Sequence, residues 1–410
     1  MSRYVMIGNG TAAVGCIEGI RSVDPAGEIV VVSGEKHPAY GRPLISYYLE
    51  NRTDLEHMQY REDGFYEKNG CRVIYGRRAV SLDPAGKSVT LDDGQTLTYD
   101  MACVATGSRA FVPPLEGLET VENRFCFMTL DDALALEAVL TEQSRVLVVG
   151  AGLIGLKCAE GIRDRVAGIT VCDLADHILS SILDADGAKV VQRHLEENGI
   201  RFLLGDSVER FEGNVAHMKS GKAVAFDLVV LAVGVRPNVE LVADGKGKVN
   251  RGIIVDDRMQ TSLPGVYAAG DCTEGYDAST NTHRVLAILP NAYMQGHTAG
   301  INMAGGHAAF DNAIPMNAIG FFGLHLMTAG SYEGDCVEDK QDGSIRRFFI
   351  KNGRLNGFIL IGETERAGIY TSLIREKTPL DTIDLAFTKK MASNLIFSKE
   401  IRRKKFGGVV

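Results

Sequence analysis

The 410-residue sequence contains no tryptophan, no C-x-x-C motif and no apolar stretch close to the ~20 residues that a membrane-spanning helix needs. Positive charge is also scarce: the net charge is −8, and the only dense basic run is 402–405. A chain of this charge lacks the basic surface that nucleic acid requires. We therefore expect no nucleic-acid partner and no membrane span.

The eight cysteines are scattered along the chain and have no metal-ligand spacing, so no metal site is expected. Cys103, Cys158 and Cys172 lie within apolar runs and should be small buried hydrophobes. The first strand begins by Tyr4, which leaves no room for a signal peptide. These features together predict a reduced, cytoplasmic protein.

Two glycine-rich turns each follow an apolar run and precede a helical pattern. The first is Gly8-Asn-Gly-Thr-Ala-Ala13, and the second is Gly150-Ala-Gly-Leu-Ile-Gly155. A strand, a tight glycine turn and a helix N-terminus together direct backbone N–H groups at a pyrophosphate. One such motif is a weak signal, but two in one chain indicate that the protein binds two dinucleotides.

An acidic residue stands about 20 residues beyond each glycine motif, where the ribose hydroxyls of a dinucleotide are usually bound. The candidates are Glu35 after the first motif and Asp173 after the second. Asp173 is followed by Leu174 and Ala175, so no arginine is available for a 2′-phosphate. Because a carboxylate repels that phosphate, the second site should prefer NADH to NADPH.

Each motif is also followed by a later strand that ends in a turn of small residues. Residues 100–107 end in Ala105-Thr-Gly107, and residues 227–233 lead into Gly234. This repetition is the strongest organisational signal in the sequence. In the loop after Glu35, Arg42 could bind a phosphate in the bidentate manner of arginine; the alternative is an ordinary surface arginine.

The rest of the chain alternates strand and helix patterns. Hydrophobic periodicity, turn residues and capping residues predict the following elements: a helix closing at Gly70, strands over 71–75 and 79–82, a hairpin over 87–99, a helix capped by Thr129, helices over 184–198 and 290–305, and a strand over 261–271. From about 312, a hairpin turning at Asn352-Gly353 and a helix over 366–377 predict a small antiparallel α+β unit.

These motifs, in this order and spacing, resemble the two-dinucleotide flavoproteins that include glutathione reductase. The likeness extends from residue 3 to about 385 and favours the branch of rubredoxin reductases, oxygenase ferredoxin reductases and the flavin part of nitrite reductase. It implies an α/β fold with two Rossmann-like dinucleotide-binding domains and a small C-terminal α+β domain. The implied division is a discontinuous FAD domain (1–112 and 240–310), an NAD domain (113–239), an interface domain (311–390) and a tail (391–410).

The resemblance also implies FAD on the first motif and NAD(H) on the second. The residues implied for FAD are Gly8, Gly10, Thr11, Ala12, Ala13, Glu35, Arg42, the Val80 backbone, Ala105, Thr106, Gly107, Gly270 and Asp271. Those implied for NAD(H) are Gly150, Gly152, Gly155, Asp173 and Gly234. The helix that begins near Pro290 would point at the pyrimidine edge of the flavin.

Three departures from the family pattern bear on catalysis. Residues 40–50 hold no cysteine, so reduction of disulfide or peroxide through a protein thiol is not expected. Tyr47 stands where ferredoxin reductases often have lysine, and it could contact the flavin or only pack the loop. Lys157 stands where many relatives have glutamate, and it could face the flavin and stabilise its reduced anion, or turn outward to solvent.

The resulting hypothesis is an NADH-dependent flavoenzyme that passes electrons to a small protein such as a rubredoxin or a ferredoxin. One alternative is an NADH oxidase or small-molecule reductase that uses no redox cysteine. Another is a flavoprotein that binds NAD as a sensor or docking module. A homodimer is possible on the resemblance alone.

Overall fold

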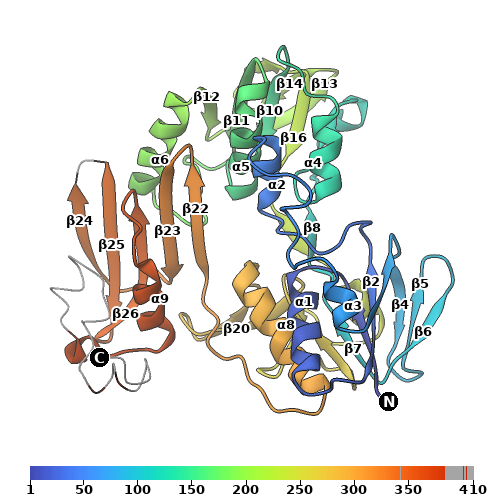
Figure 1. The fold of residues 1–410 in the computed structure, drawn as a ribbon. Helices are drawn as coiled ribbons and strands as arrows, with labels where there is room; N and C mark the ends of the chain where they lie inside the picture. The colour runs from blue at the N-terminus through green and yellow to red at the C-terminus, as the bar shows by residue number, and fades with distance from the viewer. Residues whose placement is uncertain (342, 384–399, 401–402, 404–410) are drawn as a thin grey trace.

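The computed structural model describes residues 1–341, 343–383, 400 and 403, and places three five-stranded sheets in three groups of elements (Figure 1). Two of the sheets are parallel and open, with helices beside them, and the third is antiparallel. We name the three groups the first, second and C-terminal units, in the order in which their sheets begin.

The first unit has the strand order β19-β7-β1-β2-β3. Its elements are β1 (Arg3–Ile7), α1 (Thr11–Arg21), β2 (Glu28–Ser33), α3 (Phe65–Lys68), β3 (Cys71–Tyr75), β7 (Met101–Val104), α7 (Glu240–Asp244), β19 (Val266–Ala268) and α8 (Leu289–Met303). Its antiparallel appendage is β4 (Ala79–Asp83), β5 (Ser88–Leu91) and β6 (Thr96–Thr98). Strand β19 joins this sheet although the whole second unit intervenes in sequence, so the first unit is built from two separate stretches of chain.

The second unit repeats this arrangement, with the strand order β12-β11-β10-β16-β9. Its elements are β9 (Arg124–Phe125), α4 (Leu130–Glu137), β10 (Arg145–Val149), α5 (Leu153–Ile162), β11 (Gly168–Asp173), α6 (Ala185–Glu197), β12 (Ile200–Leu204) and β16 (Leu228–Leu231). Its appendage is β13 (Val208–Glu212), β14 (Val215–Met218) and β15 (Ala223–Ala225). The repetition predicted from the sequence is therefore confirmed.

The C-terminal unit is an antiparallel sheet in the order β22-β23-β26-β25-β24, with α9 (Ala367–Arg375) against it. Its strands are β22 (Met316–Phe321), β23 (Leu324–Gly330), β24 (Asp335–Gln341), β25 (Ser344–Lys351) and β26 (Arg354–Ile361). Asn352 and Gly353 both have positive φ, 52° and 68°, which is the type I′ hairpin turn that this pair predicts.

The remaining described elements are short. They are α2 (Leu44–Leu49), β8 (Ser108–Ala110) paired with β17 (Val235–Pro237), β18 (Ile253–Ile254), β20 (Thr273–Asp277), β21 (Thr282–Arg284) and the 3₁₀ turns at 118–120, 163–165 and 380–382. Helix α2 belongs by sequence to the first unit but packs on α5 of the second, as Figure 1 shows. One hydrophobic cluster joins Leu49 of α2, Leu156 of α5 and Phe321 of β22, so all three units share a core.

The predicted strand over 261–271 is too long. Only Val266–Ala268 is a strand, because Pro264 and Gly265 form a turn in which Gly265 has a φ of 72°. The predicted tail, 391–410, lies outside the described residues except for 400 and 403. The domain boundaries given above stay a prediction.

Helices α1 and α8 pack side by side with almost no space between their backbones (Figure 1). A Cβ atom on any of four glycines would lie 2.0–2.3 Å from a carbonyl oxygen of the other helix; these are Gly15, Gly19, Gly296 and Gly300. Only glycine permits this approach, which holds residues 289–303 against the first helix of the chain.

Replacing Gly300 with alanine should therefore lower the free energy of unfolding by about 1–3 kcal/mol, because the new methyl group has no room. Gly368 of α9 is the matched control, since a Cβ there meets nothing within 4 Å. We expect Gly368→Ala to be neutral or slightly stabilising. Thermal unfolding of the two variants checks this, and equal midpoints would contradict the packing argument.

Candidate functional site

The first glycine of each motif permits a backbone crossing that no side chain would allow. Gly8 and Gly150 have φ values of 119° and 115°, in the region that favours glycine. A Cβ atom on Gly8 would lie 2.1 Å from the carbonyl oxygen of Ala105, and one on Gly150 would lie 2.3 Å from that of Ala232. The two turns thus pass the ends of β7 and β16 in the same way.

The second glycine of each motif is required neither by the backbone nor by packing within the protein. Gly10 and Gly152 have negative φ values, −106° and −78°, and a Cβ atom on either would meet nothing within 4 Å. Each is the N-cap of a helix whose first N–H groups have no helical partner. The open space in front of them fits a pyrophosphate that approaches the backbone closely.

The remaining motif residues line the same helix starts. Thr11, Ala12 and Ala13 form the first turn of α1 and are buried. A Cβ atom on Gly155 would lie 2.1 Å from the carbonyl oxygen of Gly150, so this glycine brings α5 close to its strand. Beside the first turn, Asn9 accepts a hydrogen bond from the Tyr66 hydroxyl at 2.7 Å, but its buried Nδ2 has no partner. A donor of this kind suits a bound phosphate or ribose oxygen.

The two acidic residues have different surroundings. The carboxylate of Asp173 accepts the N–H groups of Ala151 at 2.6 Å and Ala175 at 2.8 Å, so it is fixed against the second glycine turn. The next residue, Leu174, is 67% exposed and offers an apolar surface beside that carboxylate. An adenosine with free ribose hydroxyls suits this arrangement.

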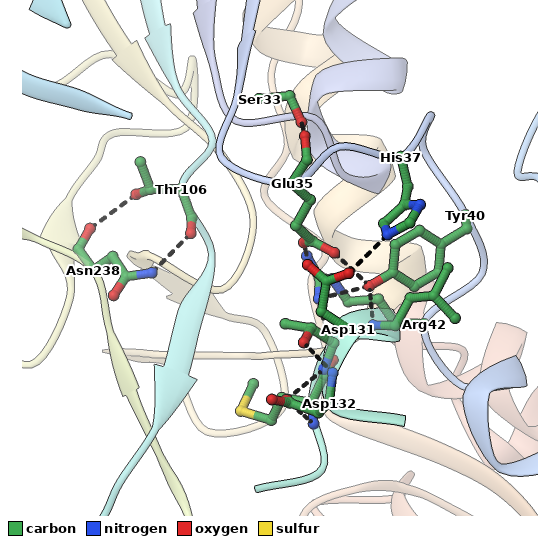
Figure 2. Close-up of polar contacts among 12 residues, drawn as sticks. Ser33, Glu35, His37, Tyr40, Arg42, Thr106, Asp131, Asp132 and Asn238 are labelled. Carbon is green, nitrogen blue, oxygen red and sulfur yellow. Dashed lines mark hydrogen bonds and ion pairs between the residues drawn. The ribbon is translucent and has the colours of Figure 1, made fainter. Parts of the chain in front are cut away.

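Glu35 instead forms an ion pair with Arg42 and accepts a hydrogen bond from the Tyr40 hydroxyl at 2.7 Å (Figure 2). Arg42 also donates to the carbonyl oxygen of Met128 at 3.1 Å. The structure therefore brings together the two residues that the sequence singled out, and it adds Tyr40, which sequence reasoning missed. The proposed phosphate contact of Arg42 stays a prediction.

Val80 lies at an irregularity of the β4–β5 ladder, where pairing passes from Ala79 directly to Ser81. Its backbone is left out of the ladder register and the residue is 56% exposed. A bulge of this kind leaves backbone N–H and C=O groups free for a ligand such as adenine. The proposed adenine contact through the backbone is thus geometrically available.

The turn at the end of β7 contacts the residue that follows β17, at the crossing between the first two units. The Thr106 hydroxyl donates to the carbonyl oxygen of Asn238 at 2.9 Å, and the Asn238 amide donates to that of Thr106 at 2.8 Å (Figure 2). Gly107 and Gly234 both have positive φ and open space at the Cβ position. Hydrogen bonds therefore fix the two chain segments to each other where they cross, and the two glycines leave room for a ligand beside them.

Gly270 and Asp271 follow β19, where α1 and α8 converge. The Gly270 N–H donates to Gln295 Oε1 at 2.8 Å, and a Cβ atom on Gly270 would lie 3.1 Å from that of Ala12. Burial raises the pKa of the Asp271 carboxyl, opposed by the positive charge of Arg42 and a hydrogen bond from Ser108. A half-buried carboxyl here could accept hydrogen bonds from the hydroxyl groups of a bound ligand.

Lys157 does not turn outward to solvent: only 15% of its side chain is exposed. Its ammonium group pairs with Glu160, donates to the carbonyl oxygen of Gly320 at 3.2 Å and lies 4.7 Å from the ring centroid of Tyr47. The solvent-facing alternative is therefore wrong. The flavin-facing role of Lys157 and Tyr47 stays a prediction, but the charge of Lys157 already has a partner.

Glu160, which sequence reasoning missed, completes this junction. Its side chain is 5% exposed, and its second oxygen accepts the N–H of Phe322 at 2.6 Å. His194 of α6 contacts the carbonyl oxygens of Phe321 and Phe322 at 3.0 and 3.2 Å. Helices α5 and α6 thus hold the β22–β23 turn by polar contacts that depend on tertiary structure.

The cysteines within apolar runs are buried, as predicted. Cys272, next to Asp271, is fully buried, and burial raises its pKa to about 12, so it is no nucleophile. Among the described residues, no three His, Cys, Asp or Glu side chains are arranged to hold a metal ion. In the same part of the chain, every helix is too short or too polar to cross a bilayer.

Each glycine turn and the helix N-terminus that follows it leave open space for a ligand, and we call each such site a glycine cradle. Two glycine cradles on two similar parallel sheets define the class: an oxidoreductase that binds two dinucleotides. The chain belongs to the pyridine nucleotide-disulphide oxidoreductase family, whose model matches residues 2–296. A second model, the C-terminal domain of rubredoxin NAD⁺ reductase, matches residues 315–378. The protein is accordingly an FAD-dependent oxidoreductase that uses NAD(H).

Two curated proteins and one solved structure illustrate what the chain is similar to. The chain is 31% identical to the assimilatory nitrate reductase electron transfer subunit of Bacillus subtilis, over 95% of this chain and 50% of that protein. It is 30% identical to the NADH-dependent phenylglyoxylate dehydrogenase subunit epsilon of Aromatoleum evansii, over 98% and 97%. A ferredoxin reductase structure from Rhodopseudomonas palustris is 25% identical, with a TM-score of 0.87 over 96% and 100%. The chain thus spans half of the first relative and nearly all of the other two.

Replacing Lys157 with methionine should lower the free energy of unfolding by about 3–5 kcal/mol, because Glu160 would remain as a buried charge without its partner. Lys189, paired with Asp186 on the exposed face of α6, is the matched control, and Lys189→Met should have little effect. Denaturant unfolding measures both. The double change Lys157→Met with Glu160→Gln should recover part of the loss, and no recovery would contradict the pairing.

Proposed function

We propose that this protein takes electrons from NADH through FAD and passes them to a small electron-carrier protein of the rubredoxin or ferredoxin type. FAD would occupy the cradle of Gly8, Gly10 and the first turn of α1, and NADH the cradle of Gly150, Gly152 and Gly155. When bound, FAD accepts a hydride and can release the electrons singly. The exact domain boundaries, 1–112 with 240–310, 113–239 and 311–390, are part of this proposal.

The observation that carries the proposed acceptor is the absence of a thiol between the two cradles. Residues 40–50, which connect the first unit to α5 through α2, contain no cysteine. The glycine-motif helices and the Asp271 turn hold three cysteines, Cys16, Cys158 and Cys272, and all three are fully buried. With no accessible thiol between the two cradles to receive them, the electrons would leave to an acceptor outside the chain.

The residues around the two cradles have distinct proposed roles. Asp271 would bind the ribityl hydroxyls, the Val80 backbone would hold the adenine of FAD, and Asp173 would hold the adenosine ribose of NADH. Ala105, Thr106 and Gly107 would border FAD, and Gly234 would border NADH. Tyr47 and Lys157 would lie on the α2–α5 side of the reacting rings.

The acceptor class is supported by the C-terminal match to rubredoxin reductases and by the likeness to a ferredoxin reductase. A cytoplasmic location fits the eight free thiols. A homodimer remains part of the proposal that rests on the resemblance alone.

The decisive test is spectroscopic. The purified protein should be yellow, and anaerobic NADH should bleach the flavin absorbance within milliseconds. Oxidised rubredoxin or ferredoxin should then restore the absorbance faster than oxygen does. A protein that takes up no FAD would overturn the proposal. Faster re-oxidation by oxygen would favour an NADH oxidase, and absent bleaching would favour a sensor or docking role.

The nucleotide preference can be tested by changing the second ribose site. Asp173→Ala combined with Leu174→Arg should lower kcat/KM for NADH at least tenfold and raise it for NADPH, because a repelling carboxylate is exchanged for a cation. Leu174→Ala alone is the control and should keep the preference for NADH. Steady-state kinetics with both nucleotides measure the effect, and an unchanged ratio would show that Asp173 does not contact the ribose.

A further inference from the structure

Tyr40 occupies the point at which the adenosine end of the FAD cradle meets the second unit. The residue is 8% exposed, and it belongs to the loop between β2 and α2. Figure 2 shows its hydroxyl between Glu35, Arg42 and the start of α4. No motif in the sequence marks it.

The Tyr40 hydroxyl has three partners. It donates to Glu35 Oε2 at 2.7 Å, accepts the backbone N–H of Leu130 at 2.8 Å, and lies 3.3 Å from Arg42 Nη1. Because a hydroxyl has one proton, accepting from Leu130 leaves that proton for Glu35. The orientation of the Glu35 carboxylate is therefore linked to the position of α4.

Other contacts fix the start of α4 against the same loop. Arg42 donates to the carbonyl oxygen of Met128, and His37 contacts the Asp131 carboxylate at 2.8 Å. A capping box of Thr129 and Asp132 closes the helix start, as the sequence predicted. The helix presents a rigid N–H at Leu130, so the hydroxyl is held by a fixed donor rather than by a mobile chain.

We propose that Tyr40 is a positioning residue that orients Glu35 for the adenosine ribose of FAD and makes this orientation depend on the docking of α4. The proposal rests on the proposed function, since it takes FAD as the ligand of the first cradle. It adds a link by which the second, NAD-binding unit influences how tightly the first unit holds its flavin.

Tyr48, in the helix α2 that follows the same loop, provides a matched control. Its hydroxyl donates to the Glu137 carboxylate at 2.7 Å, so it too contacts α4, but at the other end of that helix. It makes no contact with Glu35 or Arg42. Removal of either hydroxyl therefore loses one tyrosine–carboxylate hydrogen bond and one contact with α4, and only Tyr40→Phe alters the FAD cradle.

The experiment measures the dissociation constant of FAD from the holoprotein by flavin fluorescence. We expect Tyr40→Phe to weaken FAD about tenfold, as for a lost hydrogen bond to a charged group, and Tyr48→Phe to leave it within about twofold. Glu35→Ala should also weaken FAD, and the double variant Tyr40→Phe with Glu35→Ala should bind FAD as Glu35→Ala does. FMN, which lacks the adenosine, should be insensitive to all of these changes.

Hydrogen exchange tests the link to α4. The Leu130 amide should exchange faster in Tyr40→Phe and at the wild-type rate in Tyr48→Phe. If Tyr40→Phe fails to fold, Leu130→Pro replaces the N–H with a ring carbon at a helix position that accepts proline, and Leu130→Ala is its control. Leu130→Pro should weaken FAD relative to Leu130→Ala.

The outcomes separate the two proposals. A wild-type protein that binds no FAD overturns both. A wild-type protein that binds FAD, with multiplicative effects of Tyr40→Phe and Glu35→Ala, leaves the proposed function intact and shows that Tyr40 does not act through Glu35. Equal weakening by Tyr40→Phe and Tyr48→Phe, or an unchanged Leu130 exchange rate, also overturns the positioning role.

Discussion

The close contact between α1 and α8 is the constraint on which the first unit depends. Four glycines let the two helix backbones touch, although 267 residues separate Arg21 from Leu289 along the chain. This contact places the start of α1, the middle of α8 and the end of β19 at one point, where Gly270, Ala12 and Gln295 meet. Without it, α8 would not hold Gly270 beside the start of α1.

A second constraint is the shared core around α2 and the β22–β23 turn. Buried Phe321 packs among residues of the first and second units, and the Lys157–Glu160 pair holds the turn that follows it. A buried ion pair adds little net stability over an apolar pair, but it fixes one geometry because each charge must keep its partner. The C-terminal unit is therefore attached by specific contacts next to α5, whose N-terminus forms the second glycine cradle.

Local patterns predicted much of the fold. The glycine motifs, the Thr129 capping box, the Asn352-Gly353 turn and the stop of α6 before Gly199 involve neighbouring residues, and each appears as expected. The predicted strand over 261–271 was wrong because the apolar residues on both sides of Pro264-Gly265 resemble one continuous strand, whereas these two residues form a turn. Tyr40 and Glu160 were missed because each contacts a partner at least 90 residues away. The repeated G-x-x-x-G spacing at Gly15-Gly19 and Gly296-Gly300 is the one signal that could have revealed the helix contact.

The sequence by itself determined that the protein has two dinucleotide cradles and no thiol between them, because a glycine turn and its helix are local structures set by a few adjacent residues. Only the tertiary structure decided which way the charged side chains face. From the sequence alone, the Lys157 side chain could extend to solvent or inward; in the folded protein it is surrounded by Glu160, Gly320 and Tyr47. Likewise, the sequence left Glu35 without an assigned partner; in the folded protein it contacts Arg42 and Tyr40. A flexible charged side chain takes the orientation that its folded neighbours satisfy, and those neighbours are distant in sequence.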